Sequence, residues 1–160
     1  MGIYSNILSN VPQPMHECTS GLGMPANRLH QLLESVLIAK LFDACEEHGM
    51  DVMPEGKNKD GEPSTRIADI LITDYDEAPV VIIEVCGNET YTEAKKRVKE
   101  FFDTNPTSMK EGFIYNFNSN TWDYYRNNRR VDNSAFCKTV SKDLRRIIEN
   151  SKIYAKYLKG

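Results

Sequence analysis

The chain has 160 residues, of which 40% are hydrophobic and 27% are charged, and its formal net charge is −3. This composition is typical of one globular domain with a buried core. No run reaches the ~18 apolar residues of a membrane span, and residues 1–20 lack the basic start and apolar block of a secretory signal. We therefore expect a cytoplasmic protein that has no membrane partner.

Two regions open the chain. Residues 1–24 are rich in Ser, Asn, Pro and Gly and predict an N-terminal arm, which leaves 25–160 as a single domain. A helix is expected from near Pro25 to about His48, because apolar residues recur at helical spacing and Pro is tolerated in a first turn. Gly49 follows this helix and is expected to close it.

Strands are expected next. A strand is expected to begin at Asp51, and residues 56–64 predict a polar turn. Residues 66–73 and 80–86 are β-branched runs that predict a strand pair joined by a turn. The second run is apolar at nearly every position, so we expect a central strand that is buried on both faces.

The remaining elements complete an α/β pattern. A helix is expected from Tyr91 to about Asp103, a second strand pair at 112–117 and 121–126, and a last helix over about 135–158. The resulting order, α-β-β-β-α-β-β-α, predicts a mixed central β-sheet flanked by helices.

Four cysteines lie far apart, at Cys18, Cys45, Cys86 and Cys137, and form no CxxC or His/Cys cluster. A structural zinc site is therefore not expected. Each cysteine is most simply a small buried side chain in a reducing compartment.

Two acids are unusual because of where they stand. Asp69 interrupts an apolar strand, and Glu84 lies near the end of the most hydrophobic one. A charge there costs several kcal/mol unless it is paired or binds a metal. If the strands are neighbours, the two carboxylates can converge at one sheet edge and, with a backbone carbonyl, suit Mg²⁺ or Mn²⁺. Such a site would support phosphodiester hydrolysis. Alternatively, both acids pair with lysines or cap backbone amides.

This pattern resembles the PD-(D/E)XK nuclease superfamily, which has the restriction-endonuclease-like fold. The resemblance lies in Ala68-Asp69 and Glu84-Val85-Cys86, with Glu34 on the first helix, and covers roughly residues 25–126. It implies that Asp69, Glu84 and the carbonyl of Val85 bind Mg²⁺ or Mn²⁺, and that Glu34 is an accessory catalytic acid acting through water. Alternatively, Glu34 merely flanks an amphipathic helix. His30, one turn before Glu34, either contributes to this site as well or has a purely structural role.

Two positions depart from the family pattern. Ala68 replaces a turn-shaping proline, and Cys86 replaces the lysine that polarises the attacking water. A thiol cannot supply that positive charge. Some members are similar in carrying the lysine on the following helix. There, Lys95 lies nearest the edge of the predicted buried face and is our candidate for a migrated catalytic lysine, with Lys99 second. The alternative is an ordinary solvated lysine.

Positive charge is concentrated at the end of the chain. Residues 1–125 carry ten Lys/Arg against twenty Asp/Glu, whereas residues 126–160 carry ten against three, a split of −10 and +7. The basic segment either contacts a polyanion or folds back on the acidic body. In the first case its phosphate-binding residues would be Arg129, Arg130, Lys138, Lys142, Arg145 and Arg146. The nearby Trp122, Tyr124 and Tyr125 are expected in the sheet core rather than as stacking surfaces for bases.

Two hypotheses follow. The first is a metal-dependent endonuclease or exonuclease, in which Asp69 and Glu84 bind the metal and Lys95 assists the water. The second is the same fold without catalysis, which binds nucleic acid or a protein partner; its motivation is the missing lysine at Cys86. A homodimer or a larger complex is left open by the sequence.

Overall fold

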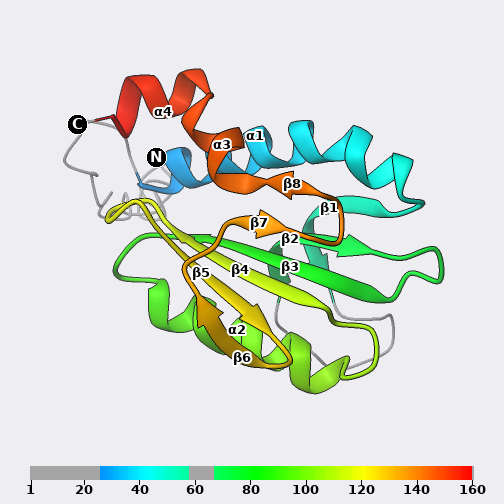
Figure 1. The fold of residues 1–160 in the computed structure, drawn as a ribbon. Helices are drawn as coiled ribbons and strands as arrows, with labels where there is room; N and C mark the ends of the chain where they lie inside the picture. Colours follow the sequence, from blue (N-terminus) through cyan, green and yellow to red (C-terminus); the bar gives the residue numbers. More distant parts are fainter. Residues whose placement is uncertain (1–25, 58–66, 160) are drawn as a thin grey trace, which may run out of the picture.

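The structure, a computed structural model, describes residues 26–57 and 67–159 (Figure 1). The arm predicted at 1–24 and most of the polar turn predicted at 56–64 lie outside the described residues. The helix expected from near Pro25 to about His48 is α1 (Ala26–Glu47). Within the described residues, no helix is long and apolar enough to cross a membrane.

A six-stranded mixed sheet forms the centre of the molecule. Its strands are β1 (Asp51–Lys57), β2 (Ile67–Thr73), β3 (Pro79–Cys86), β4 (Glu111–Asn116), β5 (Thr121–Arg126) and β6 (Arg129–Asp132). They lie side by side in chain order, and all neighbours are antiparallel except β3 and β4. A parallel pair needs a crossover connection, and here α2 (Tyr91–Thr104) provides it.

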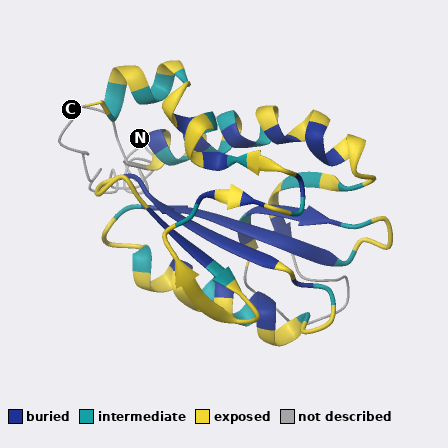
Figure 2. Ribbon diagram, in the orientation of Figure 1, coloured by how far each residue is buried: buried dark blue, intermediate teal, exposed yellow. Residues whose placement is uncertain are grey.

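The sheet carries helices on both faces. α1 packs on the face where Ile70, Ile83 and Tyr115 contribute to the larger apolar core. α2 covers the other face and buries Ala94, Val98, Phe101 and Phe102, which lie on the helix face predicted from their spacing. Every residue of β3 is buried, as expected for a central strand (Figure 2). The predicted fold class, a mixed sheet flanked by helices, is therefore confirmed.

One glycine sets the distance between α2 and the sheet. A Cβ atom on Gly112 in β4 would lie 2.9 Å from Cγ1 of Val98 and 3.1 Å from Cε2 of Phe102. Both contacts are shorter than ordinary van der Waals distances. The absence of a side chain at this position therefore lets α2 approach the strands closely.

The prediction of one long basic helix over 135–158 was wrong. This segment instead forms β7 (Phe136–Cys137), β8 (Lys142–Asp143), α3 (Leu144–Glu149) and α4 (Lys152–Tyr157). Ser141 has a φ of 53°, which no right-handed helix accommodates. The side chain of Ser151 accepts a hydrogen bond from the backbone N–H of Tyr154 and starts a second short helix.

A buried carboxylate fixes the turn between β7 and β8. Glu111, at the start of β4, is 3% exposed and accepts backbone N–H groups from Lys138 and Thr139 at 3.0 and 2.8 Å. It also accepts the hydroxyl of Tyr124 at 3.1 Å. These bonds satisfy a buried charge and hold the short β7–β8 hairpin against the sheet.

Trp122, Tyr124 and three of the four cysteines are buried, as the sequence predicts, and Tyr125 is half-buried. Trp122 and Tyr124 are buried in the core and stack on Tyr115 and Phe113, so they are not exposed stacking surfaces. Three cysteines, Cys45, Cys86 and Cys137, are buried free thiols. The fourth, Cys18, lies outside the described residues.

Candidate functional site

The acids singled out in the sequence meet at one end of the sheet. Asp69 lies near the start of β2 and Glu84 near the end of β3, and the two antiparallel strands place them beside the paired residues Ile70 and Ile83. α1 and α2 both begin at this end, which is the left side of Figure 1. Residues far apart in the sequence therefore converge there.

Three side chains form a compact cluster at this end. Nε2 of His30 lies 3.1 Å from Oε1 of Glu34, one turn later on α1, and 3.1 Å from Oδ2 of Asp69 on β2. Ligand atoms of all three residues lie within 4.8 Å of one another. The geometry therefore brings the predicted Glu34 and Asp69 together, and it adds His30 as a central member.

The carboxylates strongly favour the charged form of His30. Partial burial acts to lower the pKa of His30, but the carboxylates of Asp69 and Glu34 outweigh it and raise the pKa from 6.5 to about 10. At neutral pH the imidazolium is thus the cation that holds the two carboxylates together. A divalent ion bound here would take the place of that proton.

Glu84 faces α2 and is held by an arginine. Its side chain is 0% exposed. Nε of Arg97 donates a hydrogen bond to its Oε2 at 2.7 Å, and Nη2 of Arg97 lies 2.7 Å from the same oxygen. The other carboxylate oxygen lies 3.4 Å from the backbone N–H of Asp69. Oδ2 of Asp69 in turn accepts the backbone N–H of Val85 at 2.8 Å. These contacts link β2, β3 and α2 around the two acids.

Burial dominates the titration of Glu84 and Cys86. Burial, and then the carboxylate of Asp69, raise the pKa of Glu84 above its ordinary value, and Arg97 opposes both. Burial and the nearby Glu84 raise the pKa of Cys86 to about 12. Cys86 is therefore a protonated thiol at neutral pH and is a poor nucleophile.

The cation beside Glu84 is Arg97 and not the predicted Lys95 or Lys99. Nζ of Lys95 instead lies 4.7 Å from the ring centre of Tyr91, and Nζ of Lys99 lies 2.6 Å from Oδ2 of Asp103. Arg97 could have been predicted as the partner of a buried carboxylate, because a guanidinium provides two donors and a lysine provides only one point charge.

The His30–Glu34–Asp69 cluster fits a divalent transition ion. Adjacent ligands of an octahedral ion with bonds of about 2.1 Å lie about 3 Å apart, which is close to the two 3.1 Å separations around Nε2 of His30. An imidazole with two carboxylates suits Mn²⁺ better than Mg²⁺, which prefers oxygen alone. Glu84 is not part of this cluster among the described residues.

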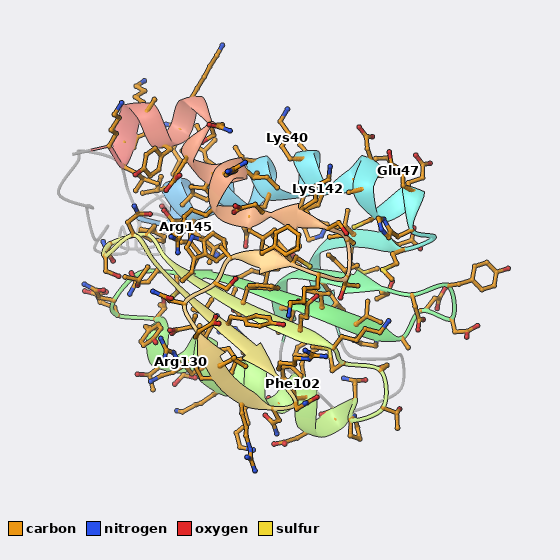
Figure 3. All side chains as sticks on the ribbon, viewed as in Figure 1. Lys40, Glu47, Phe102, Arg130, Lys142 and Arg145 are labelled. Atoms are coloured by element: carbon orange, nitrogen blue, oxygen red, sulfur yellow. The ribbon has the colours of Figure 1, made fainter. Side chains whose placement is uncertain are left out.

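The basic residues at the end of the chain do not form one surface. Arg130 pairs with Asp123 at 2.6 Å, and Nη2 of Arg145 donates to the backbone carbonyl of Asn133. Lys138 lies beside Glu111, at the opposite end of β4 from the cluster. Lys142, also labelled in Figure 3, lies in β8, whereas Arg130 lies in β6 and Arg145 in α3. Arg129 and Arg146 are exposed, and Arg146 pairs with Asp143.

The comparisons with known proteins give a likeness of fold. No family model and no curated protein matches the sequence. Among solved structures, the chain is similar to a protein from Anabaena variabilis ATCC 29413 that is described as a candidate nuclease belonging to DUF820. The TM-score is 0.58 and the identity 12%, over 74% of this chain and 79% of the other. At that identity the likeness establishes a shared fold.

Proposed function

We propose that this protein is a metal-dependent nuclease that hydrolyses phosphodiester bonds in nucleic acid. The observation that carries the proposal is the cluster of His30, Glu34 and Asp69 at the sheet end where Glu84 is also buried. Its support is twofold. The ligand set suits Mn²⁺ better than Mg²⁺, and the fold is shared with a protein described as a candidate nuclease.

Each residue has a distinct part in this proposal. Asp69 binds the metal directly, and the imidazole of His30 and the carboxylate of Glu34 bind it from α1. Glu84 and the carbonyl of Val85, which the sequence pattern also indicates as ligands, border the same site. A bound divalent ion would stabilise negative charge on the phosphate and lower the pKa of the attacking water.

Arg97 supplies the positive charge that Cys86 cannot. It already holds Glu84 through two short contacts, so its charge is fixed at the sheet end where a phosphate would bind. A guanidinium remains protonated throughout the physiological range. It therefore stabilises a charged transition state but does not act as a base.

One observation favours a second candidate, a protein with the same fold that binds nucleic acid without cleaving it. The ion pair with Arg97 occupies the Oε2 atom of Glu84, and that atom would otherwise be free to bind a metal. If this ion pair persists when metal is added, Asp69, the two α1 residues and the carbonyl of Val85 remain as ligands without Oε2 of Glu84.

A cleavage assay tests the proposal. We expect the wild-type protein to cut single-stranded or plasmid DNA, or RNA, with Mn²⁺ and not with EDTA. Asp69→Asn should lower the rate at least about 100-fold, because it removes the central ligand. Asp76→Asn, at an exposed turn, is the matched control and should retain full activity. Equal rates for wild type and Asp69→Asn, or no cleavage by either, would contradict the proposal.

A further inference from the structure

A second polar hollow lies at the same end of the sheet, beyond the cluster. Its volume is about 400 Å³, within the range of small-ligand sites. It is lined by residues of the β4–β5 turn, β5, β6, α3 and the segment after β6: Asn120, Thr121, Trp122, Asp123, Arg130, Asn133, Arg145 and Glu149. Nothing in the proposed metal site uses these residues.

The hollow exists because β6 is short. β6 pairs only with Tyr124, Tyr125 and Arg126, so the first half of β5 has no strand beyond it. The hollow lies along this uncovered half of β5. Arg130 reaches it from β6 and Arg145 from α3, and Figure 3 shows both on the same side of the molecule.

Two contacts join the region of the hollow to the segment that follows β3. The loop after β3 contacts the β4–β5 turn, where Asn118 accepts the backbone N–H of Asn88 at 2.8 Å. The hydroxyl of Tyr91, at the start of α2, donates to Asp123 in the hollow. Three strand spacings separate β2, which carries Asp69, from β5, on the order of 14 Å. A single strand a few nucleotides long spans that distance.

The chemistry of the lining matches a nucleotide better than a bare anion. Arg145 donates to the neutral carbonyl of Asn133 and provides charge for a phosphate, whereas Arg130 is already paired with Asp123. The carboxylates and side-chain amides of the lining offer acceptors and donors for a base edge. Trp122 also lines the hollow, and its buried indole N–H has no hydrogen-bond partner among the described residues. A buried donor without an acceptor is costly.

We infer that this hollow binds one nucleotide of a single-stranded nucleic acid, a few positions from the bond that the metal site cleaves. The inference rests on the proposed nuclease function. Arg145 contacts the phosphate, and the base lies against the first half of β5, which β6 does not cover. Only an unpaired strand can place a base there, because a base inside a duplex is stacked and paired.

The test uses the one tryptophan of the sequence, Trp122, as a reporter. Its indole N–H gives a single signal in the ¹H–¹⁵N spectrum. With EDTA present, so that no strand is cut, we expect a 12-nucleotide single strand to shift this signal saturably. The same sequence as a 12-base-pair duplex should shift it much less. An unmoved signal, or equal shifts for both, would overturn the inference.

Two basic residues provide a pair of variants. Arg145→Met should weaken single-strand binding about tenfold, as expected for the loss of one charge-assisted contact. Lys96→Met should change it less than twofold, because Lys96 pairs with Glu93 on the exposed side of α2 and does not line the hollow. Equal affinities for the two variants would overturn the assignment. The cleavage assay with Asp69→Asn is read separately, so failure of the metal site and failure of the hollow are distinguishable.

Discussion

His30 is a residue whose surroundings strongly change its titration. Its pKa is raised from 6.5 to about 10 in the folded protein, so between those values the folded state binds more protons than the unfolded state. The stability that it contributes is therefore complete below about pH 6.5 and is lost as pH rises through about 10.

This linkage gives a pH prediction for the protein in EDTA. We expect His30→Gln to remove part of the decrease in unfolding free energy that the wild type shows between pH 6.5 and 10. Urea denaturation at several pH values measures it. His48→Gln is the control, since His48 is exposed at the end of α1 and lies beside no carboxylate cluster. Parallel pH profiles for His30→Gln and wild type would contradict the interpretation.

The cation beside Glu84 was only partly predictable from the sequence. The sequence indicated that a helix after β3 would bring a positive charge near the strand acids, and α2 does so. Helical position favoured Lys95, yet this lysine lies over the ring of Tyr91 and Arg97 contacts Glu84. The choice depended on side-chain length and on two-donor geometry, which helical position alone does not express.

At the scale of elements, the contact between α2 and β4 is sensitive to a single methyl group. Gly112→Ala should lower the unfolding free energy by about 1–3 kcal/mol, because its Cβ would collide with Val98 and Phe102. Thermal or urea unfolding measures this loss. Adding Val98→Ala removes the nearest colliding atom, so the double variant should lose less than the sum of the two single losses. Strict additivity would count against this packing.

The end of the chain shows where local pattern failed at the element scale. Val140, Leu144, Ile147 and Ile148 recur at helical spacing, yet they are divided between the β7–β8 hairpin and α3. The hairpin is held by the buried Glu111, which lies far away in the sequence. A contact of this kind overrides periodicity, because the buried carboxylate must be satisfied by whichever backbone reaches it.

For the whole molecule, metal binding should appear as stability. If Mn²⁺ binds only the folded protein, 100 times its dissociation constant adds about 2.7 kcal/mol, equivalent to roughly 5–10 °C in Tm for a domain of this size. Calorimetry measures the shift. Asp69→Asn should abolish it and Asp76→Asn should retain it. A retained shift in Asp69→Asn would place the metal elsewhere, and no shift in the wild type would favour the non-catalytic candidate.

The sequence by itself determined the fold class, the central strand and the amphipathic face of α2. It also identified two acids that stand in apolar strands, where water cannot solvate their charge. Those features are local: they follow from periodicity, β-branched runs and the cost of charge in an apolar strand. Only the tertiary structure decided which groups meet. It brought His30 and Glu34 of α1 close to Asp69 and placed Arg97 beside Glu84. It also placed the basic residues of the last segment at two ends of the sheet. Such meetings depend on strand register and helix placement, which bring distant residues within a few ångströms of one another.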